Sequence, residues 1–338
     1  MDQSTGFVDH NPTLDTYWRS IVLLGRNVAS YKFALAKTLL EIPQKNNLIL
    51  LEELALPFAK NVSDHLIHND RQIYSPSSKF LDYCRQFNRG EINEEELRSY
   101  SARFGFINVI DAFHNVDHNE TPRFFIDARK NQKGLELTDN FYNLFESSQG
   151  NNLTIEVDAR WRLWETALSL NINPNLLEIN SDLENESLYV INDSLRRIDV
   201  TSSRDALNGY QKGKCFYCYR DIQIQQGLEN SCDVDHFFPH ILKQSGFHNV
   251  DQIWNLVLSC RDCNRGSGGK FESIPMDYFL PKLYTRNNFY IESHHPLRET
   301  IINQTGRTKE QRLHFLNRLS LDVGQARPTL SKWQPPKS

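Results

Sequence analysis

The sequence has few of the features that mark a secreted or membrane-spanning protein. Its 338 residues include only 6 cysteines, and no apolar run reaches the about 18 residues that a membrane helix needs. The first residues lack a basic stretch followed by an apolar one, so no secretory signal is expected. Internal repeats and low-complexity tracts are also missing. A hydrophobic content of 39% and a charged content of 24% instead predict a cytoplasmic globular protein with room for two domains.

Negative charge is scarce in one half of the chain and abundant in the other. Residues 204–338 contain 18 Lys and Arg against 13 Asp and Glu, whereas residues 1–203 contain 20 against 29. Because Lys and Arg dominate phosphate binding, nucleic acid should favour the C-terminal half. The acidic N-terminal half is more suited to a protein partner or to shielding the C-terminal half.

Four of the cysteines form two Cys-x-x-Cys pairs, Cys215 with Cys218 and Cys260 with Cys263. Four thiolates make the closed tetrahedral shell of a structural Zn²⁺ site. The intervening segment, residues 219–259, is longer than the roughly 15 to 20 residues of a compact zinc ribbon. A redox pair or buried free thiols are the alternatives, but two pairs in one short segment favour zinc.

Polar residues of a different kind lie within this zinc frame. They are Asp233, Asp235 and His236 in Cys-Asp-Val-Asp-His, then Asn255 and Asn264. Alternation along a strand would put the two aspartates on one face and the histidine on the other, unless the strand ends there. Taken singly, these residues could be a capped strand end or ordinary turn residues. Together they offer hard or borderline metal ligands and a proton-transfer group beside soft thiolates.

The order of these motifs resembles the HNH endonucleases, whose core is the ββα-metal motif. The resemblance covers about residues 212–275, and Asp-Val-Asp-His with Asn-Arg-Gly is similar to the HNH domain of RNA-guided CRISPR nucleases. It implies one catalytic Mg²⁺ or Mn²⁺ held by Asp235 and Asn264, with His236 as the general base. Asn255 would fix the imidazole by a hydrogen bond. Cleavage would leave 5′-phosphate and 3′-hydroxyl ends.

The chemistry of phosphodiester hydrolysis requires these residue types. An ion must neutralise the charge that builds on the phosphorane and on the departing oxygen. Histidine has the pKa best suited to deprotonating water near neutral pH. The expected substrate is double-stranded DNA. An RNA-cleaving HNH enzyme, or a non-catalytic zinc module that binds nucleic acid or protein, are the alternatives.

Three cations surround the second cysteine pair and are candidates for substrate binding. They are Arg261, Arg265 and Lys270, with three glycines between the last two. They could approach a phosphate backbone closely, or they could belong to a solvated, flexible helix end. His240 and His248 follow the Asp-His pair, and position alone gives them no role.

The N-terminal half has the periodicity of amphipathic helices. Apolar residues recur at three- and four-residue steps over 17–40, 50–67, 94–116, 137–145 and 158–170. Pro57 should kink or divide the second run. Aromatic residues such as Trp161 and Trp164 could stack on bases, but such a stripe is more often core.

The expected fold is α+β and mostly α, with a boundary near residue 200. Residues 1–200 would form a helical regulatory or partner-binding domain, and 201–338 the HNH domain with C-terminal helices. An acidic helical half attached to a toxic nuclease suggests docking to a partner or autoinhibition, as in a phage-defence effector.

Overall fold

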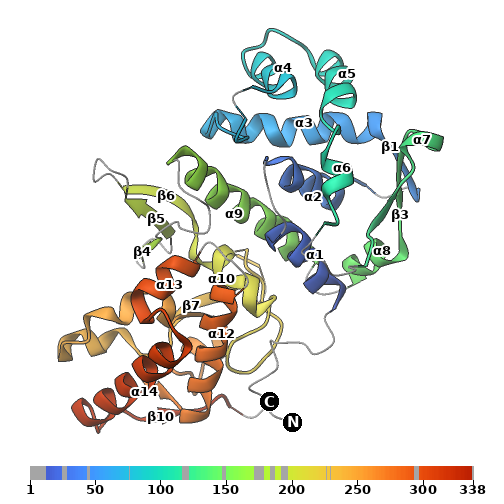
Figure 1. Ribbon diagram of the computed structural model, residues 1–338. Helices are drawn as coiled ribbons and strands as arrows, with labels where there is room; N and C mark the ends of the chain where they lie inside the picture. Colours follow the sequence, from blue (N-terminus) through green and yellow to red (C-terminus); the bar gives the residue numbers. More distant parts are fainter. Residues whose placement is uncertain are drawn as a thin grey trace. The chain divides into compact units, whose positions relative to one another are not determined.

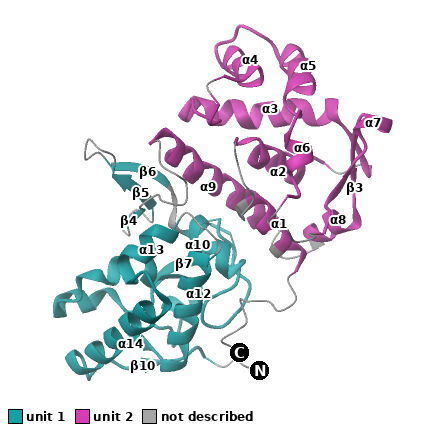
Figure 2. Cartoon of the chain, in the orientation of Figure 1, with its two compact units in different colours: residues 1–11, 173–338 teal, residues 12–172 magenta. Residues whose placement is uncertain are grey.

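The structure, a computed structural model, divides the chain into two compact units (Figures 1 and 2). It describes residues 13–24, 29–43, 46–75, 77–115, 122–146, 150–170, 179–182, 187–191, 197–225, 227–228, 230–292 and 297–336. The N-terminal unit is Pro12–Ile172, and the C-terminal unit contains Asn173–Ser338. The division therefore precedes the boundary expected near residue 200. Hydrogen bonds from Ile179 N to Thr300 Oγ1 (2.6 Å) and from Ser181 Oγ to Asp251 O (2.8 Å) join the intervening segment to the C-terminal unit.

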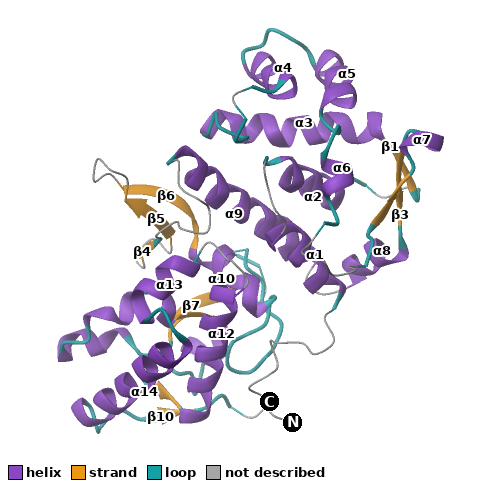
Figure 3. Cartoon of the chain, in the orientation of Figure 1, coloured by secondary structure: helices purple, strands orange, loops and turns teal. Residues whose placement is uncertain are grey.

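The N-terminal unit is built mainly of helices (Figure 3). Its helices are α1 (Leu14–Leu24), α2 (Tyr31–Glu41), α3 (Leu51–His68), α4 (Lys79–Asn88), α5 (Glu94–Phe104), α6 (Val109–Ala112), α7 (Arg129–Gln132), α8 (Asp139–Glu146) and α9 (Gly150–Ser169). A small antiparallel sheet has the order β1-β3-β2, formed by β1 (Leu48–Leu50), β2 (Phe125–Asp127) and β3 (Gly134–Leu137). Far more of the described residues of this unit lie in helices than in strands, which confirms the α-rich character expected from the periodicity.

Two sequence expectations for these helices need correction. Pro57 lies inside α3, which runs undivided from Leu51 to His68. Proline removes one backbone bond, and the buried face that includes Phe58 and Val62 outweighs that loss. The run expected over 94–116 is two helices, because α5 ends at Phe104 and α6 begins at Val109.

The aromatic stripes of the N-terminal unit form its core. Trp18 and Trp161 are at most 1% exposed and Trp164 is 5% exposed. Trp161 stacks on His65 and donates from Nε1 to Gln72 Oε1 at 2.9 Å. These rings are therefore packing groups, and the alternative of a base-stacking platform does not apply to them.

The C-terminal unit combines short sheets with helices. Its strands are β4 (Asn180–Asp182), β5 (Ser187–Ile191), β6 (Arg197–Ser202), β7 (Cys232–His236), β8 (Leu256–Cys260), β9 (Ile274–Pro275) and β10 (Lys332–Trp333). Its α-helices are α10 (Ser203–Gln211), α11 (Arg261–Arg265), α12 (Leu280–Glu292), α13 (Arg298–Thr305) and α14 (Lys309–Ala326). Short 3-10 segments are η3 (His240–Ser245), η4 (His248–Asp251), η5 (Ile253–Asn255) and η6 (Asp277–Phe279).

The strands in the described part of the C-terminal unit form three separate sheets. Strands β4, β5 and β6 make one antiparallel sheet, β7 pairs antiparallel with β8, and β9 pairs parallel with β10. The whole chain is thus α+β and mostly α, as expected. None of the described helices combines the length and the hydrophobicity that crossing a bilayer demands.

Candidate active site

The site is organised by the ribbon of β7 and β8, whose two ends carry different chemistry. The antiparallel register pairs Cys232 with Cys260 at one end and His236 with Leu256 at the other. All five residues of β8 are buried. Helix α11 begins directly after β8, at Arg261. Two strands and a helix in this order give the ββα arrangement expected from the sequence.

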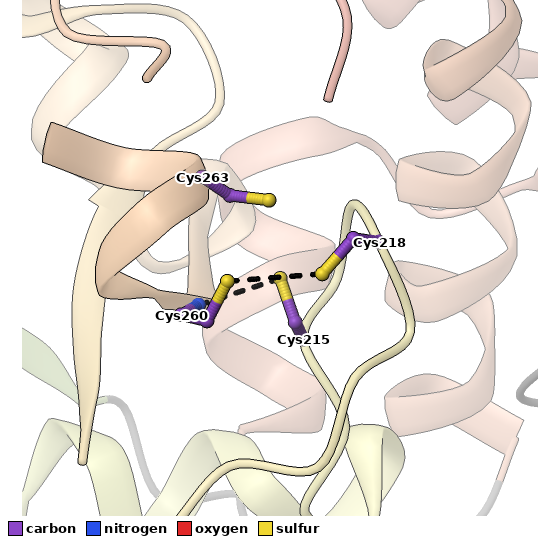
Figure 4. A group of neighbouring side chains, drawn as sticks. All are labelled: Cys215, Cys218, Cys260 and Cys263. Carbon is purple, nitrogen blue, oxygen red and sulfur yellow. Dashed lines mark hydrogen bonds between the residues drawn. The ribbon is translucent and has the colours of Figure 1, made fainter. Parts of the chain in front are cut away.

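The four cysteines of the two Cys-x-x-Cys pairs meet at the first end of the ribbon. Figure 4 shows their sulfurs turned toward one another, and all four lie within 4.8 Å of each other. Sulfurs at tetrahedral corners with a Zn–S bond of about 2.3 Å lie about 3.8 Å apart. Cys218 Sγ and Cys260 Sγ are 3.7 Å apart, so the cluster has the dimensions of a structural zinc site.

Backbone contacts fix the cysteine cluster to the ribbon. Cys260 N donates to Cys215 Sγ at 3.3 Å, and Phe216 N donates to Leu258 O at 2.9 Å. Burial raises the pKa of the Cys215 thiol, so a divalent cation is the natural partner for an ionised sulfur in this place. Cys232 and Cys84 are buried and stand outside the cluster.

Asp233 and Asp235 lie two residues apart on β7, and each is at most 7% exposed. Asp233 accepts from Asn264 Nδ2 at 3.1 Å and from the Arg265 guanidinium at 2.9 Å. Asp235 accepts from Tyr217 Oη at 2.7 Å. Burial raises the pKa of the Asp235 carboxyl. The Asn264 amide therefore contacts Asp233, and not Asp235 with which it was expected to share an ion.

These groups suit a hard divalent ion by their donor chemistry. Carboxylate and amide oxygens are the ligands that Mg²⁺ and Mn²⁺ take in proteins. A buried carboxylate such as Asp235, whose pKa is raised by desolvation, is a group that a nearby cation would stabilise. The assignment of Asp235 and Asn264 as ligands stays a prediction, and Asp233, which contacts Asn264, is a further carboxylate on the same strand.

Lys270 has a different environment from the one expected of a phosphate ligand. Its side chain is fully buried and its ammonium lies 3.2 Å from Asp235 Oδ1. The ammonium also donates to Phe271 O at 3.3 Å. A cation enclosed in this way neutralises Asp235 and presents nothing to a substrate at the surface. Arg261 and Arg265 are exposed, the latter with 59% of its side chain accessible.

His236 is the last residue of β7 and lies at the second end of the ribbon. Burial lowers the pKa of its imidazole to about 4; Asp251 opposes this shift, and His240 and Lys270 add to it. Its Nε2 lies 3.2 Å from Asp251 Oδ1. The imidazole is therefore neutral near pH 7, which is the state that accepts a proton.

Asn255 holds the loop after β7, and its amide contacts are with the backbone. Its Nδ2 donates to Phe238 O at 2.8 Å and to Val250 O at 2.7 Å, and its Oδ1 accepts from Phe238 N at 2.8 Å. Asn255 is fully buried. The expected bond from Asn255 to the imidazole is thus replaced by bonds to Phe238, before η3, and to Val250, within η4, which fix the path of the chain between them.

Buried polar side chains from two helices hold the ribbon in place. Gln211 of α10 donates to Leu258 O at 2.7 Å and accepts from Leu258 N at 2.8 Å. Arg286 of α12 is fully buried and donates to Ile253 O (3.2 Å), Trp254 O (3.3 Å) and Leu256 O. These bonds satisfy backbone groups where η5 leads into β8, so the helices outside the ribbon position it.

Three neighbours of the site had no sequence signal. Asp251 and His240 reach His236 only because η3 and η4 fold back over the end of β7. Tyr217 lies between the first two zinc ligands, where an aromatic residue reads as core, yet its hydroxyl contacts Asp235. Asp251 lies four positions before Asn255. Such a spacing places two side chains together only within one α-helix, and these residues lie in two separate 3-10 segments. Sequence reasoning therefore had no pattern from which to find them.

The β7–β8 ribbon, the helix α11 that follows it and the four-cysteine cluster, with Asp235 and His236 at the end of β7, together have the ββα arrangement. Residues 215–275 match the family model described as HNH endonuclease. The chain therefore carries an HNH endonuclease domain in its C-terminal unit, as the sequence motifs indicated. The match includes both cysteine pairs and the Asp-His and Asn-Arg-Gly motifs. No curated protein and no solved structure matches the chain.

Proposed function

We propose that the protein is a metal-dependent endonuclease that hydrolyses DNA phosphodiester bonds. The observation that most supports this is the match of residues 215–275 to the HNH endonuclease family, within which His236 ends β7 with its Nε2 3.2 Å from Asp251 Oδ1. HNH nucleases act on nucleic acid and use divalent metals. The basic balance of residues 204–338 favours binding of a polyanion by this part of the chain.

In the proposed reaction His236 removes a proton from the attacking water. The water oxygen bonds to phosphorus, the bond to the 3′ oxygen breaks, and the departing oxygen takes a proton from solvent. Asp251, 3.2 Å from Nε2, stabilises the imidazolium that forms. Mg²⁺ or Mn²⁺ on Asp235 and Asn264 would neutralise the charge that builds on the phosphate oxygens. Exposed Arg261 and Arg265 would contact the phosphate backbone.

The test is incubation of purified protein with supercoiled plasmid in Mg²⁺, in Mn²⁺ and in EDTA. We expect cleavage with either ion and none in EDTA. His236→Ala should lower the rate by roughly 10² to 10⁴ if the imidazole is the general base, while zinc content stays unchanged. His248→Ala, an exposed histidine in the same loop, is the matched control and should cut normally.

The same assay separates the alternatives. DNA binding without cleavage in any metal would favour a non-catalytic zinc module, and faster cleavage of RNA in direct competition would change the substrate. A His236→Ala variant that cuts as fast as the native protein would contradict the assignment of the base.

We further propose that the acidic, helical N-terminal half serves a protein partner that controls the nuclease, as in a phage-defence effector of the cytoplasm. The charge difference between residues 1–203 and 204–338 supports this, because like charge discourages nucleic acid from the first half. Phage plaques should be fewer on cells that make the native chain than on cells that make His236→Ala. Equal plaque numbers would reject the defence role.

A further inference from the structure

Three side chains at the end of β7 form a cluster that the proposed reaction does not fully use. His236, His240 and Asp251 each offer one ligand atom, and these atoms lie within 4.8 Å of one another. They come from three segments, β7, η3 and η4. Asp251 Oδ1 is the common point, at 2.7 Å from His240 Nδ1 and 3.2 Å from His236 Nε2.

The Nε2 atom of His236 is buried, and among the described residues no hydrogen-bond partner is aligned with it. Asp251 Oδ1 is close enough to attract it but does not satisfy it. A buried polar atom in this condition calls for an explanation, and a bound ion is one such explanation beside a water or a catalytic role. The unsatisfied nitrogen points to a ligand at the centre of the cluster.

The spacing of the cluster suits a first-row transition ion. Tetrahedral ligands bound at about 2.0 to 2.1 Å lie about 3.3 Å apart, and the contact between His236 and Asp251 already has nearly this length, 3.2 Å. The contact of His240 with Asp251, 2.7 Å, would have to open slightly. His240 can do so because 61% of its side chain is exposed.

The composition of the cluster separates it from the proposed magnesium site. Two imidazoles and one carboxylate favour Zn²⁺, Cu²⁺ or Ni²⁺ over Mg²⁺, and three protein ligands leave a position for water. Lys243 holds the second oxygen, Asp251 Oδ2, at 2.5 Å, so one carboxylate oxygen remains for an ion. The neighbouring positive charge of Lys243 should make binding weaker than at the four cysteines, and therefore exchangeable.

We propose that His236, His240 and Asp251 form a second, exchangeable transition-metal site, and that its occupation switches the nuclease off. The inhibition rests on the proposed function, in which His236 is the base. A divalent cation on one ring nitrogen lowers the proton affinity of the whole imidazole, so the base is lost when the ion is bound. Transition-metal binding itself requires no catalysis.

The first experiment counts ions on the full-length protein. Protein that retains one Zn²⁺ at the four cysteines is titrated with Zn²⁺ by calorimetry, and with Co²⁺ by visible absorption. We expect one further equivalent to bind through nitrogen and oxygen ligands. Loss of an outer-shell partner costs roughly 10- to 100-fold in metal affinity, so His240→Ala and Asp251→Asn should weaken this step by at least that much. His248→Ala should bind like the native chain.

The second experiment measures plasmid cleavage in Mg²⁺ with and without added Zn²⁺. The native protein and His248→Ala should be inhibited at the Zn²⁺ concentration that fills the second site, whereas His240→Ala should require far more. A single Zn²⁺ per chain in excess metal, or unchanged binding by His240→Ala, would overturn the site. Equal inhibition of His240→Ala and native protein would overturn the switch. Second-site binding with no cleavage by native protein would reject the nuclease and leave the site standing.

Discussion

The two ends of the β7–β8 ribbon bring their candidate metal ligands together by different means. At the cysteine end the ligands come in two Cys-x-x-Cys turns, so local geometry already brings each pair together. At the histidine end the neighbours of His236 arrive from η3 and η4, and the loop that carries them is fixed by Asn255. One end is specified by sequence spacing and the other by the folding of a loop, which means that they should fail in different ways.

Breaking the cysteine end should have the largest effect. Zinc binding contributes on the order of 10 kcal/mol to folding in zinc-finger peptides, so Cys215→Ser should lose zinc and unfold the C-terminal unit. Zinc analysis and near-ultraviolet circular dichroism would measure this. Cys232→Ala is the matched control, because Cys232 pairs with Cys260 across the ribbon but is not in the cluster. A Cys215→Ser protein with full zinc content and a native spectrum would contradict a structural zinc site at the four cysteines.

Removing the buried ammonium of Lys270 should have the second-largest effect. Lys270→Met leaves Asp235 buried without its partner, and breaking a buried ion pair costs about 3 to 5 kcal/mol. Urea unfolding at neutral pH would show the loss. If Asp235 is a ligand of the catalytic ion, Mg²⁺ should restore more stability to Lys270→Met than to native protein. No difference in the Mg²⁺ effect would argue against Asp235 as a ligand.

Releasing the loop at the histidine end should cost less. Asn255→Ala removes three buried hydrogen bonds, worth about 0.5 to 1.5 kcal/mol each. We expect a lower free energy of unfolding, with zinc retained because the cysteine end is independent of the loop. Calorimetric melting and zinc analysis would measure both. Zinc loss in this variant would show that the two ends are coupled.

The smallest effect concerns a surface cation. Arg265→Ala removes one exposed guanidinium beside Asn264, and each phosphate contact contributes about 0.9 to the slope of log affinity against log salt. For DNA binding, the magnitude of the slope of log affinity against log salt should fall by about that amount, with little change in the free energy of unfolding. Lys270→Met, whose ammonium is buried, should leave the slope alone. Equal slopes for native protein and Arg265→Ala would remove Arg265 from the interface.

Sequence reasoning succeeded where chemistry is carried by neighbours in the chain. The cysteine pairs and the ribbon-helix order could be predicted because ligand spacing and strand alternation are local properties. Sequence patterns did not indicate Asp251, His240 or Tyr217 as neighbours of the site, because their contacts depend on long-range folding. The burial of Lys270 could not be predicted either, because burial of a cation has no sequence signature. The two compact units divide before the boundary expected near residue 200, because β4, β5 and β6 belong to the C-terminal unit.

The buried guanidinium of Arg286 has a consequence for where the nuclease domain can be cut from the chain. It lies in α12, beyond residue 275 where the family match ends, yet it binds the carbonyl groups that lead into β8. A fragment that stops at residue 275 would leave these carbonyls without their donor. The minimal autonomous fragment must therefore extend through α12, and the family signature marks the chemistry of the domain without marking its full extent.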